Sequence, residues 1–545
     1  MKAYLHTLIS DSLNRIDPNH PEVEIIIEKP RIPEHGDAST NVALIAAKRF
    51  NTAPRQLAES IVANLALDST MIDNVSIAGP GFINFKFSNY WLVHQLKNVL
   101  NHLESYGRSD SNKAKRIQVE FVSANPTGPL TVGHGRNAVL GDTIARLLEW
   151  TGASVQREYY FNYAGRQMRV LGESVLVRYQ QLIGQNIELE EGFYEGEYIR
   201  DIAQNLLNEK GNTLAENEDL RFFTAAARDA MFEDIKTTLK RMHIHMDTFF
   251  NEHDLYEQGA LDKVIQRLKQ QDLVYEKDGA TWFKTTQFGK EKDTVLIKST
   301  GEPTYRLPDI AYHIDKLDRG YDLCIDIFGA DHIATYPDVI SALQALGYNT
   351  DRVQVMVYQF VTIVKEGQPF KMSTRKANFV TLDELMDEVG ADVTRFFFLM
   401  RSPGTHLEFD IAQAKDASDK NPVFYLQYAN ARINSILRKA NETYDFNLLN
   451  DSTLEALTHP AELDLIRMLL EFPEVIQKSA EALEPHRMIT YLNELASSFT
   501  QFYHHCRIMG EEEKTALDRI QLLKATSAVL ENGLHILGIT APRSM

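Results

Sequence analysis

The chain has 545 residues, a formal net charge of -18 at pH 7 and two cysteines, Cys324 and Cys506. Two cysteines so far apart exclude a disulfide framework and a CxxC metal site. The negative net charge argues mildly against a nonspecific nucleic-acid binder, because such proteins are normally basic. No apolar run reaches the roughly 18 residues that a membrane span needs, and the N-terminus does not have the pattern of a signal peptide. A multidomain protein of the reducing cytoplasm is expected.

Residues 1–112 mix helical and strand-like patterns. Residues 1–16 have the apolar spacing of an amphipathic helix, and residues 22–30 are strand-like. Residues 74–87 indicate two short strands around a Gly-Pro-Gly turn. The polar stretch 104–116 then has the composition of a linker. This region is predicted to be a small α+β domain.

Residues 113–415 alternate short β-rich runs with helical ones, which favours a parallel α/β sheet. The strand-like runs are residues 116–123, 321–329 and 352–364. A long helical and mixed insertion is expected over residues 165–290. Residues 416–545 carry apolar residues at helical spacing almost throughout, which predicts an all-α bundle.

A glycine-rich turn joins a strand-like run to a helical pattern within residues 121–142. A ligand can approach the backbone closely at Gly133 and Gly135, because glycine has no side chain. The free N–H groups and the positive dipole end of the following helix suit a phosphate, to which His134 and Arg136 could add charge or hydrogen bonds. The P-loop and dinucleotide fingerprints are both absent. The pattern predicts a nucleotide site of another class; the alternative is a glycine-rich turn with a surface histidine.

A second segment, residues 369–385, follows the third strand-like run and precedes a helical pattern. Lys371, Ser373, Arg375 and Lys376 make it a basic loop, which could close on the phosphate charge that develops in a transition state. A solvated basic turn is the alternative. The tetrapeptide TVGH and the tripeptide KMS, in this order on the two halves of an α/β domain, are much more specific together than either is alone.

Together the two segments resemble the H-I-G-H and K-M-S-K-S signatures of class I aminoacyl-tRNA synthetases, which lie on a Rossmann-like domain. Longer segments are similar to arginyl-tRNA synthetases in particular. They are "EKPRIPEHGDASTNVAL", "SANPTGPLTVGHGRNAVLGD", "REYYFNYAGRQM", "PTYRLPDIAYH", "FGADHIATY", "NPVFYLQYANARI" and "LHILGITAPRSM". The resemblance covers nearly the whole chain.

The resemblance implies three domains and one reaction. An α+β domain (1–112) would contact the corner of the tRNA, a Rossmann-like parallel α/β domain with insertions (113–415) would be catalytic, and an α-helical domain (416–545) would bind the anticodon. The reaction would attach L-arginine to tRNA(Arg) through an arginyl-adenylate, consuming ATP with Mg²⁺ and releasing AMP and pyrophosphate. No structural metal and no membrane partner are implied, and a cytoplasmic monomer is expected.

The resemblance also implies site residues. Glu120, Asn125, Tyr305 and Asp309 match the arginine pocket; a guanidinium is a planar fork of donors that pairs with carboxylates, and a helix places residues four apart on one face. The residues that match the ATP site are Thr131, Gly133, His134, Gly329, Asp331, His332, Lys371, Met372 and Ser373. The residues expected to act in catalysis are His134, Lys371, Ser373 and Arg375. The residues expected to contact tRNA are Tyr425, Gln427, Tyr428, Asn430 and Arg432.

Two positions depart from the family signatures. The first histidine of H-I-G-H is Thr131 here, which cannot carry a positive charge, and the second lysine of K-M-S-K-S is Thr374. Arg375 or Lys376 could supply the missing cation. These departures keep open a non-catalytic tRNA-binding paralogue. The other alternative is a class I synthetase for another amino acid, although the acidic pocket argues against an acidic substrate and a cysteine enzyme would need zinc ligands that the chain lacks.

Overall fold

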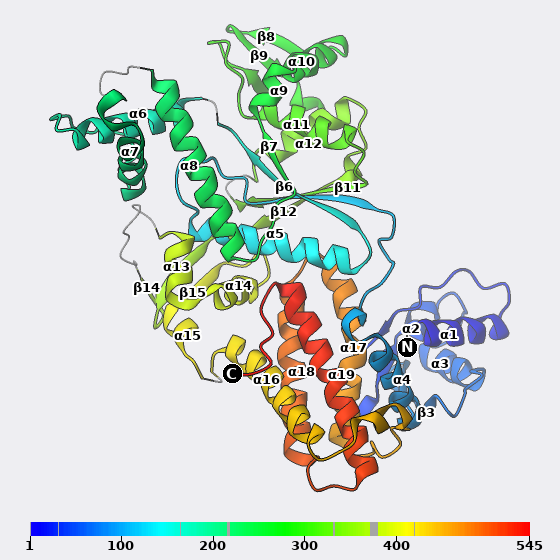
Figure 1. The fold of residues 1–545 in the computed structure, drawn as a ribbon. Coiled ribbons are helices and arrows are strands. Elements are labelled where there is room, and N and C mark those ends of the chain that lie inside the picture. Colours follow the sequence, from blue (N-terminus) through cyan, green and yellow to red (C-terminus); the bar gives the residue numbers. More distant parts are fainter. Residues whose placement is uncertain are drawn as a thin grey trace.

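The computed structural model describes residues 2–30, 32–163, 165–214, 219–330, 333–370, 380–418 and 420–545. Figure 1 shows a central α/β region, a helical bundle below it and a small N-terminal domain beside the bundle. A helical insertion and a small antiparallel sheet project from the central region away from the bundle. Among the described helices, none has the length and apolar character needed to cross a membrane.

The N-terminal domain packs helices against an antiparallel sheet with the strand order β1-β2-β4-β3. Its elements are α1 (Lys2–Ile16), β1 (Ile27–Glu28), β2 (Ala38–Thr40), α2 (Val42–Ala46), α3 (Pro54–Ala63), β3 (Ile72–Ala78), β4 (Phe82–Phe87) and α4 (Asn89–His102). The predicted first helix and the predicted hairpin are confirmed. The strand predicted over residues 22–30 is shorter than expected, because only Ile27 and Glu28 pair with β2.

The central sheet has five parallel strands in the order β12-β11-β5-β6-β7. These strands are β5 (Arg116–Glu120), β6 (Ser154–Phe161), β7 (Thr248–Asn251), β11 (Leu323–Gly329) and β12 (Val353–Tyr358). Helix α5 (Val132–Trp150) covers one face, and α11 (Arg306–Asp318) with α12 (Tyr336–Ala345) covers the other (Figure 1). Because both faces are covered, residues 117–120 of β5 are all buried. The predicted parallel α/β sheet is confirmed.

The insertion predicted over residues 165–290 is not one continuous excursion from the sheet. It contains β7, which pairs with β6 as the edge strand of the central sheet. A strand of four residues is too short to show a period in the sequence. The remaining elements of this region are α6 (Arg166–Leu182), α7 (Glu197–Lys210), α8 (Leu220–Arg241), α9 (His253–Glu257), α10 (Ala260–Gln270), β8 (Val274–Lys277), β9 (Ala280–Phe283) and β10 (Thr294–Ile297).

The strand-like run 352–364 forms two strands that belong to different sheets. β12 completes the central sheet, and the next strand lies in a second sheet with the order β14-β13-β15. The break falls at Gln359, whose backbone N–H donates to the Pro403 carbonyl at 3.0 Å. The elements after the break are β13 (Val361–Lys365), β14 (Gln368–Pro369), α13 (Leu382–Val389), α14 (Ala391–Leu399), β15 (Leu407–Asp410) and α15 (Ile411–Lys415).

The C-terminal region is the predicted all-α bundle, and the N-terminal domain docks on it. The bundle helices are α16 (Pro422–Asn441), α17 (Pro460–Glu481), α18 (His486–His505) and α19 (Glu513–Leu537). Arg467 of α17 contacts the Asp37 carboxylate at 2.6 Å, and Lys29 contacts Glu471 at 2.6 Å. The Asp37 pair is nearly buried, whereas the Lys29 pair is exposed enough to contribute little to stability.

A buried ion cluster fixes the bundle to the central α/β region. Arg395 of α14 is fully buried and donates to the Asp142 carboxylate of α5 at 2.6 Å. Its other N–H groups donate to the carbonyls of Met242, just after α8, and Leu537, the last residue of α19. Arg146 binds the same Asp142 carboxylate at 2.8 Å. One cluster therefore joins α5 and α14 to the C-terminal ends of α8 and α19, which are distant in the sequence.

Replacing Asp142, the acid of this cluster, should destabilise the central α/β region. Asp142→Asn leaves Arg395 buried without an anion, which should lower the free energy of unfolding by about 3–5 kcal/mol in urea denaturation. Burial raises the pKa of Asp142, but Arg395, Arg146 and Arg157 outweigh burial and hold it below its usual value. The carboxylate therefore contributes stability above its unfolded pKa of about 4, and the difference between wild type and variant should shrink as the pH falls below that. Asp110→Asn, in an exposed pair with Lys113, is the control and should leave the urea midpoint unchanged.

Candidate active site

The carboxyl ends of β5, β6, β11 and β12 lie along one edge of the central sheet, because the four strands are parallel. Helix α5 begins after the turn that follows β5. In open α/β sheets this edge is where ligands bind. The candidate site is therefore built from the residues that end these strands and from that turn.

The TVGH turn is organised by reciprocal capping of α5. The His134 backbone N–H donates to Thr131 Oγ1 at 3.4 Å, and the Thr131 backbone N–H donates to His134 Nδ1 at 3.1 Å. Because Nδ1 accepts, the ring proton is on Nε2. Burial lowers the pKa of His134, so the imidazole is neutral at neutral pH and can offer a ligand a hydrogen bond but not a charge. Threonine at the first signature position thus serves as a helix cap.

The two glycines of this turn have different physical reasons to be glycine. A Cβ on Gly135 would lie 2.6 Å from Leu382 Cδ1 and 2.9 Å from Phe398, so this position is reserved for helix packing. A Cβ on Gly133 would meet nothing nearer than Thr131 Oγ1 at 3.6 Å. Gly133 therefore keeps space open at the helix N-terminus, where backbone N–H groups can face an anion.

Arg136 does not face this space. Its side chain is fully buried and donates to the backbone carbonyls of Gln359 at 2.5 Å, Thr405 at 3.0 Å and Ser402 at 3.1 Å. Burial lowers the pKa of Arg136 to about 10. The expectation that Arg136 could bind a phosphate is not supported by the structure, because the guanidinium instead joins α5 to the chain after β12 and to the loop before β15.

The basic segment lies mostly outside the described residues. Lys371, Met372, Ser373 and Arg375 are among the positions not described, so their predicted roles stay predictions. The chain that follows them is fixed against the TVGH turn, because the Leu382 backbone N–H donates to the Leu130 carbonyl at 2.7 Å. An isolated bridge pairs Thr131 with Thr381. The described end of the second segment, residues 380–385, therefore lies beside the TVGH turn although the two are far apart in the sequence.

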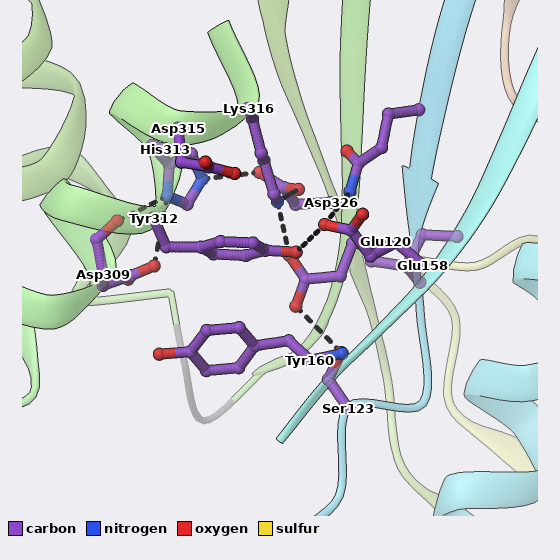
Figure 2. Close-up of polar contacts among 12 residues, drawn as sticks. Glu120, Ser123, Glu158, Tyr160, Asp309, Tyr312, His313, Asp315, Lys316 and Asp326 are labelled. Carbon is purple, nitrogen blue, oxygen red and sulfur yellow. Dashed lines mark hydrogen bonds and ion pairs between the residues drawn. The ribbon is translucent and has the colours of Figure 1, made fainter. Parts of the chain in front are cut away.

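Two of the predicted arginine-pocket residues, Glu120 and Asp309, belong to one polar network (Figure 2). Glu120 ends β5 and is buried, and its carboxylate accepts from Lys316 Nζ at 2.5 Å and from Ser123 Oγ at 2.8 Å. Asp309 lies in the first turn of α11 with 31% of its side chain exposed, and its Oδ1 is 3.1 Å from His313 Nδ1. Sequence reasoning missed the lysine and the histidine, because a buried cation is visible only once α11 is placed on the sheet.

Asn125 is connected through Asn162 to another buried carboxylate, Glu252. Its Oδ1 accepts from the Asn162 backbone N–H at 3.0 Å, and Asn162 Nδ2 donates to Glu252 Oε1 at 2.7 Å. Glu252 also accepts from the Tyr160 hydroxyl at 2.7 Å. Burial raises the pKa of Glu252, and Asp309 raises it further. Sequence reasoning missed Glu252; the available signal was an acid directly after a strand, but that strand, β7, was itself not recognised.

The other predicted residues of this edge are placed as follows. Tyr305 immediately precedes α11, four residues before Asp309, and its side chain is 89% exposed. Gly329 ends β11 and is paired with Tyr358, whose hydroxyl donates to the Gly133 carbonyl at 3.4 Å. Asp331 and His332 lie outside the described residues.

The predicted tRNA-binding residues of α16 divide into two groups. Tyr428 is 48% exposed, and the Arg432 guanidinium lies over its ring and over the Tyr503 ring at 4.7 and 4.9 Å from the centroids. Gln427 and Asn430 are buried and donate to the Thr540 and Pro542 carbonyls. Their amides therefore hold the C-terminal tail. Tyr425 is half-buried and hydrogen-bonded to Thr500.

Comparison with known proteins identifies the chain over its whole length. Family models match residues 3–87 (arginyl tRNA synthetase N terminal domain), 95–397 (tRNA synthetases class I (R), catalytic domain) and 426–545 (DALR anticodon binding domain). The chain is 52% identical to an arginine–tRNA ligase of Salinibacter ruber, with 100% of both chains covered.

The chain belongs to the arginyl-tRNA synthetase family.

A second family member, from Desulfotalea psychrophila, is 50% identical over 95% of this chain and 94% of its own. The solved arginyl-tRNA synthetase of Thermus thermophilus has the same fold, with a TM-score of 0.77 at 21% identity and complete coverage of both chains. The predicted family and fold class are confirmed. These relatives favour neither a synthetase for another amino acid nor a non-catalytic paralogue. The exact domain boundaries stay predictions.

Gly133 and Gly135, the two glycines at the start of α5 in this arginyl-tRNA synthetase, should respond differently to substitution by alanine. Gly133→Ala should leave the melting temperature unchanged but raise the KM for ATP about tenfold, since the methyl group occupies the space at the helix N-terminus. Gly135→Ala should lower the free energy of unfolding by about 1–3 kcal/mol through overpacking against Leu382 and Phe398. Thermal melts and ATP titrations of pyrophosphate exchange measure both. An unchanged ATP KM in a folded Gly133→Ala protein would contradict a nucleotide at this turn.

Proposed function

We propose that this protein charges tRNA(Arg) with L-arginine. The arginine carboxylate attacks the α-phosphate of ATP, pyrophosphate leaves, and the terminal ribose hydroxyl of the tRNA then attacks the arginyl-adenylate and releases AMP. Membership of the arginyl-tRNA synthetase family over the full chain supports this reaction. The structural observation that carries the substrate assignment is an excess of buried carboxylate at the sheet edge.

The excess is clearest at Glu252. This carboxylate is nearly buried, and its described partners are neutral donors: the Tyr160 and Tyr256 hydroxyls and the Asn162 amide. A buried carboxylate without a cation is costly, so the site favours a ligand that brings one. Asp309 is close enough to raise the pKa of Glu252 further, so a guanidinium fork could meet both acids. We assign Glu120, Asn125, Glu252, Tyr305 and Asp309 to the arginine pocket.

A pocket of this kind should discriminate between the two basic amino acids. A guanidinium offers five N–H donors in a fixed plane, whereas the lysine ammonium is a compact point charge. Lysine would leave some buried acceptors of the pocket unpaired, and unpaired acceptors give strong rejection of the wrong substrate.

The nucleotide is proposed to lie at the N-terminus of α5, with phosphates near Gly133 and His134. The remaining proposed ATP contacts are Thr131, Gly329, Asp331, His332, Lys371, Met372 and Ser373. Among the described residues no group of three or more His, Cys, Asp or Glu could hold a metal ion. Mg²⁺ would therefore arrive with the phosphates of ATP and neutralise part of their charge. The chain contributes positioning and hydrogen bonds, with His134, Lys371, Ser373 and Arg375 as the proposed catalytic residues.

The tRNA is proposed to contact both flanking domains. Tyr428 is exposed and Arg432 is half-buried beside it on α16, and both can stack on or hydrogen-bond splayed bases. Tyr425, Gln427 and Asn430 are proposed to support or join that surface. The N-terminal domain is proposed to contact the corner of the tRNA. A monomer acting in the cytoplasm is the expected state.

Pyrophosphate exchange with each of the twenty amino acids, with and without bulk tRNA, tests the proposed reaction. Exchange should appear with arginine and not with lysine or the other amino acids. Exchange that requires tRNA would add the tRNA dependence that is usual for this family. Exchange with a different amino acid would contradict the pocket assignment, and no exchange under any condition would contradict the reaction.

Removing one pocket carboxylate should weaken arginine binding selectively. Asp309→Asn should raise the KM for arginine about a hundredfold, because the guanidinium loses a charged acceptor in a partly buried site. The KM for ATP should stay within about twofold of wild type. Steady-state aminoacylation measures both constants. Asp318→Asn, on the exposed end of the same helix, is the matched control and should behave as wild type. Equal effects of the two variants would show that Asp309 does not contact the substrate.

A further inference from the structure

Three carboxylates lie side by side on the face of the central sheet that α11 covers. Asp326 of β11, Glu120 of β5 and Glu158 of β6 are at the same register, because Asp326 is paired with Glu120 and Glu120 with Glu158. All three are buried. Residues at one register of a parallel sheet point to the same side, so three negative charges would repel one another unless cations meet them.

Helix α11 supplies those cations one turn apart. Lys316 is fully buried, and its Nζ is 2.5 Å from both Glu120 Oε2 and Asp326 Oδ1. Arg319 donates to the two oxygens of Glu158 at 2.5 and 2.8 Å. Arg319 is shared between Glu158 and Asp315, whereas Lys316 is shared between Glu120 and Asp326.

His313 connects this row to the predicted arginine-binding Asp309. Its Nε2 is 2.8 Å from Asp326 Oδ2, and its Nδ1 is 2.8 Å from the Asp309 carbonyl and 3.1 Å from Asp309 Oδ1. Both ring nitrogens therefore face acceptors, which requires a proton on each. Burial and Lys316 lower the pKa of His313, but Asp326 and Asp309 raise it more, to about 10.

We propose that Lys316, His313 and Asp326 are positioning residues for the arginine substrate, which hold Glu120 and Asp309 in place and set the charge of the pocket. This inference rests on the proposed function. Asp326 holds both cations, Lys316 holds Glu120 and His313 holds Asp309 (Figure 2). Glu120, Asp309 and Asp326 against Lys316 and His313 leave one negative charge in this network, which attracts a guanidinium. Glu252 lies outside the network and adds to that attraction.

A purely structural role would not require this arrangement. A buried ion network is often no more stabilising than well-packed apolar residues of the same volume. Here hydrogen bonds and ion pairs connect Glu120 to Asp309 without a break. The three residues between them are shielded from solvent, since Lys316 and Asp326 are fully buried and His313 is 3% exposed. Its members therefore act on the substrate through Glu120 and Asp309.

The test is the arginine dependence of aminoacylation by Lys316→Met and Lys316→Arg. Lys316→Met keeps much of the side-chain volume but removes the charge, and it should raise the KM for arginine about a hundredfold while the KM for ATP stays within about twofold. Lys316→Arg keeps the charge, so its KM for arginine should be at least about tenfold lower than that of Lys316→Met. A KM for arginine equal to that of wild type in folded Lys316→Met would overturn the proposal.

The pH profile separates positioning from stability. Burial raises the pKa of Glu120, and Lys316 opposes that rise. Without Lys316 the pKa of Glu120 rises further; because arginine binds the ionised acid, the KM for arginine of Lys316→Met should fall as the pH increases from about 6 to about 8.5. The wild-type KM should be flatter over this range. The charged and titratable groups around Glu120 are Lys316, His313 and Tyr312 on α11, Asp326 on β11, and Glu158 and Tyr160 on β6.

Arg319→Met is the matched control. It removes a cation from the same face of α11 and leaves Glu158 without its pair, so it should destabilise the protein. It should not change the KM for arginine by more than about twofold, nor introduce a pH dependence, because Arg319 does not contact Glu120, Asp326 or Asp309. If Arg319→Met and Lys316→Met changed the arginine KM alike, the effect would be one of general stability and the proposal would fail.

A second measurement does not depend on the folding of a variant or on the reaction. In wild-type protein labelled at histidine with ¹⁵N, His313 should show two protonated ring nitrogens at about pH 8, well above the ordinary histidine pKa of about 6.5. Comparison with His313→Gln assigns the signal. A neutral His313 at that pH would overturn the proposed charge count, whereas absent arginine charging by the wild type would contradict only the proposed function.

Discussion

The neutralisation of three buried carboxylates on the central sheet governs how the catalytic region is assembled. Asp326, Glu120 and Glu158 stand at one register of adjacent strands, and α11 must bring Lys316 and Arg319 to them. A shift of α11 by one residue would turn these cations away and leave charges buried without partners. The helix therefore has one stable position. Its first turn, which carries Asp309, is held at the carboxyl edge of the sheet through His313 and Lys316.

The N-terminus of α5, where the nucleotide is proposed to lie, is held among the described residues by backbone contacts rather than by ion pairs. The turn before α5 is closed by capping between Thr131 and His134, and the chain that returns from the basic segment is bonded to the same turn at Leu382. Arg136 lies beneath, with its N–H groups on backbone carbonyls. Among the described residues, the turn and the returning chain are joined here by backbone hydrogen bonds. The polar groups at the helix N-terminus stay available for a nucleotide.

Two buried networks in this protein differ in how completely their charges are compensated. Around Asp142, three arginines surround one carboxylate, Arg157 also pairs with Glu149, and the remaining N–H groups of Arg395 bond to helix-end carbonyls. The cluster therefore binds domains together, and no acid in it lacks a cation. At the sheet edge, Glu252 meets neutral donors among the described residues, and Asp309 shares its histidine with another acid. The same side-chain chemistry holds elements together where each acid meets a cation, and leaves acids open to a cationic ligand where it does not.

Much of this protein was determined by local sequence patterns. The α+β, α/β and α order follows from periodicity. The glycine-rich turn follows from its place between a strand-like run and a helical pattern, and the family from motifs spread along the chain. Tertiary structure decided the rest. The edge strand β7 is too short to show a period, and the role of Arg136 depends on three carbonyls more than 200 residues away. Lys316 looks like any polar position of an amphipathic helix until the sheet is in place, because the charge it neutralises comes from strands on either side of that helix in the sequence.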